Sequence, residues 1–254
     1  MTASTERNQT LSKVPEVTLI FWIIKIAATT LGETGGDALS MSMDLGYLIS
    51  TGIFAALFAV AVIVQIGAKK FHPFIYWFTI IATTTVGTTL ADFADRSLSI
   101  GYAGGTTVLL ILLGLSLFFW HRTLGTISVE SVSTAKAEVF YWVTIMFSQT
   151  LGTALGDWTA DSAGMGYLGS AALFGGALAL LALAYWKTTI SRTILFWAAF
   201  ILTRPLGAVL GDFLDKPHDH GGLALSRFSA TVVLLLLMGA CIAFFPQRAA
   251  TKSH

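Results

Sequence analysis

The sequence predicts an all-α membrane protein with eight transmembrane helices, arranged as four parallel two-helix repeats in two four-helix halves. Three observations predict this fold: the composition, the length of the apolar runs, and a motif that occurs four times. Of the 254 residues, 55% are hydrophobic and only 11% are charged, whereas a soluble domain carries about a quarter charged residues. A membrane span needs roughly 20 mostly apolar residues. Runs of that kind predict spans at residues 17–38, 46–67, 73–93, 101–121, 138–158, 165–186, 192–213 and 223–245.

The distribution of cationic residues predicts the orientation of these spans. Ten of the 15 Lys and Arg residues fall on one side: Arg7, Lys13, Lys69, Lys70, Arg122, Lys136, Lys187, Arg192, Arg248 and Lys252. The connections on the other side carry only Arg96 and Lys216, beside several aspartates. Because cytoplasmic loops are rich in Lys and Arg, both termini are expected in the cytoplasm of a bacterial cell, with the protein in the inner membrane.

An internal repeat sets the order of the predicted helices. The stretches "TLGETGGDA", "TVGTTLADF", "TLGTALGDW" and "PLGAVLGDF" align without gaps. Each has a leading glycine (Gly32, Gly87, Gly152, Gly207) and, five residues later, an aspartate (Asp37, Asp92, Asp157, Asp212). A Gly-Tyr or Gly-Gly turn follows nine residues after each aspartate, and then a plainer apolar helix. Since every repeat holds two spans, all four repeats enter the membrane in the same direction and their motifs lie at similar depth.

The spacing of the repeats divides the chain. The aspartates are 55, 65 and 55 residues apart, so the extra residues lie in the middle. We therefore expect a first half at 16–122, a cytoplasmic linker at 123–137 and a second half at 138–246. Residues 1–15 are expected to form a mobile cytoplasmic N-terminus, and residues 247–254 a cytoplasmic tail.

The glycines of the motif predict close helix packing. Small residues four apart leave a flat face on which a neighbouring helix can approach. Packing alone is a sufficient reason for these glycines, although Ala91 replaces the second glycine in one copy. The predicted packing residues are Gly32, Gly36, Gly87, Gly152, Gly156, Gly207 and Gly211.

The acids of the motif need another reason, because a carboxylate inside the hydrocarbon costs roughly 2.5–3.5 kcal/mol. Glu33 and Asp37 are four residues apart and share a helix face. Nearby hydroxyls add neutral oxygens: Thr29, Thr30, Thr83, Thr84, Thr85, Ser148 and Thr150. Such oxygens suit hard or borderline cations. The predicted ion-, metal- or proton-binding residues are Glu33, Asp37, Asp92, Asp157 and Asp212. Each aspartate follows its helix start by about 20 residues, so a hydrated position at the outer interface is the alternative.

Three cations inside the spans, Lys25, Arg204 and Arg227, are predicted as internal counter-ions. Buried cations of this kind are expected to pair with carboxylates. At standard ionisation the five acids and three cations leave two negative charges. One divalent cation or two protons would balance them, which suggests an exchange of metal for protons.

The remaining features predict less. Asp95, Asp161 and Asp215 are interpreted as solvated turn residues, and His218-Asp219-His220 as a polar turn, with a metal-catching loop as the alternative. The tryptophans near the start of each motif helix are expected to be interfacial anchors: Trp22, Trp77, Trp142 and Trp197. Cys241 is a lone buried hydrophobe. No enzyme signature, cofactor motif or nucleic-acid-binding pattern occurs.

The four LGxxxGD-type motifs, each ahead of its turn, resemble a bacterial family of integral membrane proteins built from a repeat of unknown function. The resemblance covers Pro15 to Phe245 and implies the architecture, without a substrate. "GETGGD" is also faintly similar to the E-x-G-D motif of calcium/manganese cation exchangers, in which acidic residues bind the ion. Here the spacing is E-x-x-G-D and only one copy has the glutamate, so the similarity serves as a chemical analogy.

These patterns favour a transporter or exporter of cations, with divalent metal as the substrate class and the lipid bilayer, inorganic cations and protons as partners. Two alternatives stay open. One is a transporter of a small organic cation or metabolite, held by the same aspartates and an aromatic cage of Tyr47, Tyr102 and Tyr167. The other is a membrane scaffold or sensor whose charges only pair helices. A homo-oligomer is also left open.

Overall fold

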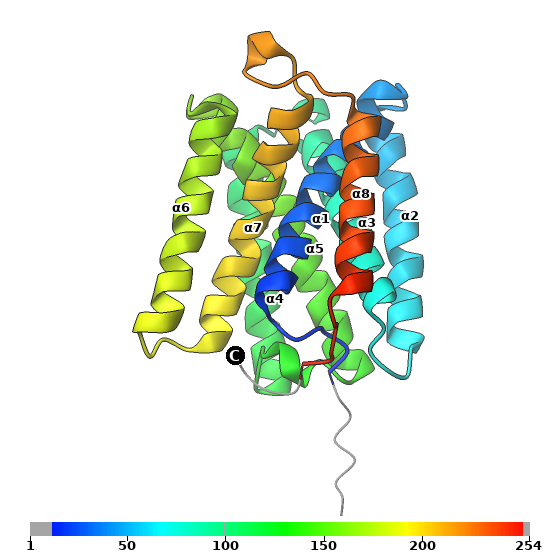
Figure 1. Cartoon of the computed structure of the whole chain (residues 1–254), viewed down its shortest axis with the longest axis vertical. Coiled ribbons are helices and arrows are strands. Elements are labelled where there is room, and N and C mark those ends of the chain that lie inside the picture. Colours follow the sequence, from blue (N-terminus) through cyan, green and yellow to red (C-terminus); the bar gives the residue numbers. More distant parts are fainter. Residues whose placement is uncertain (1–11, 99, 251–254) are drawn as a thin grey trace, which may run out of the picture.

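The computed structural model describes residues 12–98 and 100–250, and over these residues the protein is a bundle of eight helices (Figure 1). The long helices are α1 (Leu19–Asp37), α2 (Gly46–Gly67), α3 (Pro73–Asp92), α4 (Tyr102–Leu124), α5 (Ala135–Asp157), α6 (Gly166–Lys187), α7 (Arg192–Asp215) and α8 (Arg227–Phe244). Short turns are η1 (Ala38–Ser42), η2 (Phe93–Ser97), η3 (Val129–Ser131), η4 (Trp158–Ser162) and η5 (His218–His220). The predicted eight-helix, all-α fold is confirmed, and the helix bounds lie within a few residues of the predicted spans.

The helices that carry the motif form an inner ring, in which α1 packs on α3, α3 on α5, α5 on α7, and α7 back on α1. The plainer helices form an outer layer. Each of them packs chiefly on the motif helix of the following repeat: α2 on α3, α4 on α5, α6 on α7, and α8 on α1. The repeats therefore interlock around a common axis, and the two halves meet through α4 on α5 and α8 on α1.

Burial separates the two layers. In the most apolar stretches of α3 and α7, 72% and 67% of residues are buried, against 11–22% in α2, α4, α6 and α8. The outer helices thus present their apolar side chains to lipid. Six helices are long and apolar enough to cross a membrane; α1 and α5 are not among them. These two helices lie inside the ring, where polar side chains meet protein instead of lipid.

The outer end of each motif helix departs from regular α-helix. Asp37, Asp92 and Asp157 end their α-helices, and a five-residue π-helical turn follows each of them: η1, η2 and η4. Repeat four has no such turn, because α7 continues to Asp215 and leads into a longer loop. π-Turns are rare and occur often at functional sites.

The opposite end of the bundle is closed by chain segments from three places. Residues 14–16 pair with residues 248–250 through backbone hydrogen bonds. Ser12 bonds to the carbonyl of Val129 in the linker, and Lys13 forms a 2.6 Å ion pair with Glu138 at the start of α5. Residues 12–15 are thus buried, which differs from the mobile terminus predicted for residues 1–15. Residues 1–11 and 251–254, with the predicted cytoplasmic Arg7 and Lys252, lie outside the described residues.

Candidate acidic site on the bundle axis

Contacts at the motif glycines bring the four inner helices together. The leading glycine of each repeat faces the residue three positions before the leading glycine of the next helix. A Cβ added at Gly32 would overlap the Thr84 side chain, and one added at Gly207 would overlap Thr29. Only glycine permits this approach. The four contacts, Gly32–Thr84, Gly87–Gln149, Gly152–Arg204 and Gly207–Thr29, close the ring in one repeating pattern.

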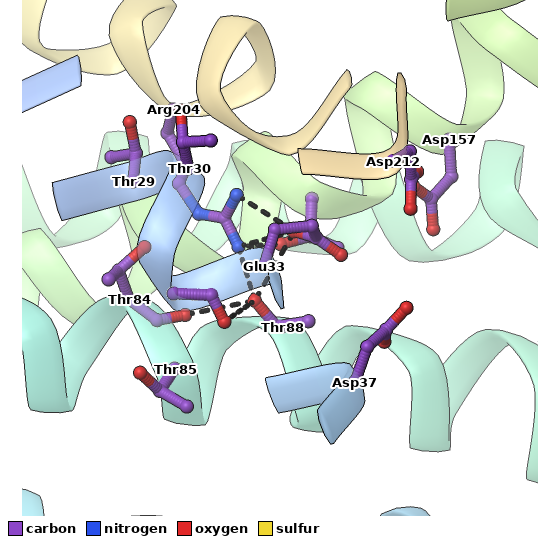
Figure 2. A network of polar contacts seen from close by, with 12 residues as sticks. Thr29, Thr30, Glu33, Asp37, Thr84, Thr85, Thr88, Asp157, Arg204 and Asp212 are labelled. Atoms are coloured by element: carbon purple, nitrogen blue, oxygen red, sulfur yellow. Dashed lines mark hydrogen bonds and ion pairs between the residues drawn. The ribbon is translucent and has the colours of Figure 1, made fainter. Parts of the chain in front are cut away.

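Arg204 reaches from α7 to side chains of the other three motif helices (Figure 2). Both terminal nitrogens donate to Glu33 Oε2 at 3.1 Å. Nη2 also donates to Thr88 Oγ1 at 2.6 Å and to Thr153 Oγ1. Glu33, Thr88 and Thr153 directly follow their motif glycines, and repeat four has the small Ala208 at that position. The Arg204–Glu33 pair agrees with the expected counter-ion role of Arg204.

The motif aspartates form a second layer, one helical turn further out. All four are nearly inaccessible: Asp37 is 1% exposed, Asp92 2%, Asp157 3% and Asp212 4%. Figure 2 shows Asp37, Asp157 and Asp212 beyond Glu33, in the same part of the bundle. A hydrated interfacial position, which the sequence left as an alternative, does not fit this degree of burial.

Two cations bridge these aspartates across repeat boundaries. Arg96 bonds Asp92 at 2.9 Å within repeat two and Asp157 of repeat three at 3.6 Å. Lys216 contacts Asp212 at 3.0 Å within repeat four and Asp37 of repeat one at 2.5 Å. Arg96 and Lys216 each follow the aspartate of their own motif by four residues. The arrangement therefore repeats with the two halves of the chain.

Lys216 follows the end of α7 and is surrounded by carboxylates. Burial lowers the pKa of its amine, but Asp212, Asp37 and Asp215 outweigh burial and raise that pKa above its ordinary value. Lys216 is therefore a charged ammonium at neutral pH.

Sequence reasoning assigned Arg96 and Lys216 to outer loops and did not place them in the site. Asp95 and Asp215, interpreted as solvated turn residues, are in fact 9% and 7% exposed, so that interpretation is wrong for both; Asp161 is exposed as expected. The signal that could have revealed the two bridges is the i, i+4 spacing of Asp92 and Arg96, and of Asp212 and Lys216.

The other predicted counter-ions behave differently from one another. Arg227 pairs with Asp215 at 3.0 Å and lies 3.8 Å from Asp37. Lys25, which was expected to pair with a carboxylate, has no ion pair or hydrogen bond among the described residues. Its Nζ lies 4.2 Å from the centre of the Phe200 ring. The expectation of pairing is therefore wrong for Lys25.

The sequence predicted a surplus of two negative charges. The structure shows the same surplus, but the charged residues that produce it are different. The ion-pair network holds six carboxylates: Glu33, Asp37, Asp92, Asp157, Asp212 and Asp215. Its cations are Arg96, Arg204, Lys216 and Arg227. At standard ionisation two negative charges remain, and the Oδ1 atoms of Asp37, Asp157 and Asp215 have no hydrogen-bond partner in the described part of the chain.

Two groups of carboxylates have the spacing of a metal site. In the first group, oxygens of Glu33, Asp37 and Asp92 lie within 4.8 Å of one another; in the second, oxygens of Asp37, Asp212 and Asp215 do so. Asp37 belongs to both. Oxygen-only ligands fit Mg²⁺, Ca²⁺ or Mn²⁺. The predicted hydroxyl ligands are mostly committed elsewhere: Thr30, for example, donates to the Ile26 carbonyl of its own helix.

Further in, the axis is closed by aromatic rings. Trp77, Trp142 and Trp197 are 1–4% exposed and pack with Tyr76, Tyr141 and other rings in one cluster. The hydroxyls of Tyr76 and Tyr141 lie 2.6 Å apart. The interpretation of these three tryptophans as interfacial anchors is therefore wrong, because they lie inside the bundle.

The outer loop and the predicted aromatic cage lie at the rim. His218, Asp219 and His220 are exposed in η5. The hydrogen bond from His220 lowers the pKa of the Asp219 carboxyl. Of the cage residues, Tyr47 accepts a hydrogen bond from Arg96 at 3.4 Å, and the guanidinium of Arg96 lies 6.0 Å from its ring centre.

The fold and this site define a helical membrane protein built from four interlocked repeats around a buried acidic cluster. The family described as Repeat of Unknown Function (DUF347) matches residues 20–71, 75–126, 140–191 and 195–246, and the chain belongs to this family. The predicted four-copy repeat family is thereby confirmed. No curated protein and no solved structure matches the chain.

Proposed function

We propose that the protein transports or exports cations, with divalent metal as the substrate class and protons as the exchanged ion. The observation that carries the proposal is that acids from all four repeats converge, buried, on one axis. Burying so many carboxylates in a membrane protein is costly and is typical of ion pathways and proton relays. Asp37, which takes part in both candidate metal groups, is the centre of the proposed site.

Lys216 supplies a physical basis for exchange. Its ammonium lies between Asp37 and Asp212, where an incoming cation would bind. An ammonium on a flexible stem is a compact point charge, and a divalent cation can replace it between two carboxylates. In this proposal the Lys216 ammonium takes the place of the substrate cation when the site is empty.

The location and orientation are part of the same proposal. The paired segments 14–16 and 248–250 lie at one end of the bundle, the end at which the α2–α3 and α6–α7 connections also lie (Figure 1). This supports cytoplasmic termini and an acidic site toward the outer face of a bacterial inner membrane. We propose a transporter and no catalytic activity.

A scaffold or sensor is the second candidate, because each motif aspartate has a cationic partner. Ion pairing of helices would explain that fact without transport. The organic-cation alternative has less support, since Arg96 already occupies the Tyr47 ring of the proposed cage.

The test is metal tolerance followed by flux. A deletion strain is grown across a panel of metal salts and complemented with wild type, Asp37→Asn, Asp157→Asn or Asp44→Asn. Asp44 is an exposed outer aspartate with φ 55°, a conformation that asparagine tolerates, so it is the matched control. We expect wild type and Asp44→Asn to restore tolerance to at least one metal. Cation flux in proteoliposomes by wild type but not Asp37→Asn would support transport; no flux by either would favour the scaffold.

A further inference from the structure

Lys25 is a buried lysine that takes no part in the ion-pair network of the acidic cluster. It lies on α1, two helical turns inward of Glu33, and its side chain is fully buried. The equivalent positions of the other three repeats hold Ile80, Ile145 and Phe200, all of them 0% exposed. The Lys25 ammonium lies 4.2 Å from the centre of the Phe200 ring, and the equivalent residues of the other motif helices are apolar. Among the described residues this lysine has no carboxylate partner, which is costly at this depth.

The layer between Lys25 and Glu33 also holds polar atoms without partners. They are Thr84 Oγ1, Ser148 Oγ, both side-chain amide atoms of Gln149, and Arg204 Nε. Buried polar groups without partners are rare in proteins, and several together offer hydrogen-bond partners to a water molecule. By their positions along the helices, these atoms lie between the level of Lys25 and the level of the Glu33–Arg204 pair.

The titratable groups on the helices around Lys25 contain no acid at its level. On α7, Arg204 follows Phe200 by one helical turn, and its positive charge repels that of the Lys25 ammonium. Tyr76 on α3 and Tyr141 on α5 lie one turn inward, and their hydroxyls are bonded to each other. α8, which also packs on α1, contributes Cys241 to the same core. The charge on Lys25 therefore depends in part on whether the charge of Arg204 is balanced by an anion.

We propose that Lys25 is the proton-binding site of the exchange, coupled to the acidic cluster through Arg204. This inference rests on the proposed function. In the structure, Arg204 is held by Glu33, so its charge is balanced. When a divalent cation recruits Glu33 as a ligand, Arg204 loses its anion and its charge acts on Lys25. The Lys25 ammonium then gives one proton to water and becomes a neutral amine; loss of the cation reverses both steps.

The experiment compares Lys25→Met, which keeps the length of the side chain, with Lys69→Met, an exposed control. Lys25→Gln is a second variant in case the methionine variant does not fold. The purified proteins, uniformly labelled with ¹⁵N-lysine, are titrated with acid and base without metal, and then with Mn²⁺ in weak buffer to count released protons. We expect a side-chain amine signal that changes with pH and disappears in both Lys25 variants. We also expect Mn²⁺ binding to release about one proton fewer from these variants than from wild type and Lys69→Met.

The outcomes separate the two proposals. If wild type and Lys25→Met bind Mn²⁺ and release equal numbers of protons, Lys25 is not the proton site, and the proposed function stands. If wild type binds no divalent cation at all, the proposed function fails, and coupling through Arg204 fails with it. The metal-free titration then still decides whether Lys25 binds a proton. An amine signal that is unchanged at every pH would overturn the proposal that it does.

Discussion

The two cationic bridges of the acidic site occupy equivalent places but differ in chemistry. Arg96 lies in the π-turn η2 and joins Asp92 to Asp157; Lys216 lies in the loop after α7 and joins Asp212 to Asp37. A guanidinium is always charged and binds with a rigid fork, whereas an ammonium is a compact charge on a flexible stem. The comparison indicates that one half of the ring has a fixed counter-ion and the other half a replaceable one.

The surroundings of the two bridges reinforce this difference. Arg96 is held further by Tyr47. Lys216 lies beside Asp37, the carboxylate shared by both groups with metal-site spacing. We therefore expect the cation to displace Lys216 and to bind at Asp37, which also has metal-site spacing to Glu33.

Removing the acid on either side should have the largest effect. Asp37→Asn and Asp157→Asn are both expected to abolish cation transport, because each removes a buried negative charge from the path. Flux in proteoliposomes, at matched protein levels, measures this. Wild-type flux by both variants would remove the aspartates from the mechanism.

Replacing Lys216 or Arg96 should next show that the two cationic bridges have different roles. Lys216→Met is expected to strengthen Mn²⁺ binding, by about tenfold for each 1.4 kcal/mol of competition removed. Arg96→Met is expected to lower stability by about 1–3 kcal/mol, because two buried aspartates lose their shared partner. Mn²⁺ titration and thermal unfolding in detergent measure the two effects. Equal changes in both variants would contradict the assignment of different roles.

Loosening the ring should affect both bridges together. A Cβ at Gly152 would overlap Arg204 of α7, whereas nothing lies within 4 Å of a Cβ at Gly52 on the lipid-facing α2. Gly152→Ala is expected to cost about 1–3 kcal/mol through overpacking. Gly52→Ala is the control and should leave the unfolding temperature unchanged or slightly raised. A loss of stability confined to Gly52→Ala would argue against the glycine-packed ring.

The smallest effect is expected in the loop that follows Lys216. Replacing both His218 and His220 with alanine should leave Mn²⁺ binding within about twofold of wild type, since both side chains are exposed. Loss of binding in this variant would instead support a metal-catching loop at the mouth of the protein. Mn²⁺ titration of the purified variant measures it.

Much of the fold could be predicted from the sequence. Apolar runs of about 20 residues located the eight helices. The gap-free alignment of the motif showed that the four aspartates share one depth, and parallel repeats then bring them to one axis. The sequence also predicted that Arg204 would pair with a carboxylate, because it is a charged group inside a span, but not that its partner is Glu33.

The partners around the aspartates could not be predicted by the same means. Hydropathy ended the predicted spans at residues 93 and 213, but η2 and the continuation of α7 carry helical structure past them. Arg96 and Lys216 consequently read as loop residues. The environment of Lys25 was also hidden, since it depends on Phe200 from another repeat. The burial of Trp77, Trp142 and Trp197 could not be predicted either, because the position of a residue along its own helix does not show which other helices surround it.

The most direct test of the central claim is equilibrium binding of Mn²⁺ to the purified protein, followed by the loss of the free-ion electron paramagnetic resonance signal. If the buried acids form one cation site, wild type and Asp44→Asn will deplete free Mn²⁺, and Asp37→Asn will not. Equal depletion by Asp37→Asn and wild type would contradict the claim.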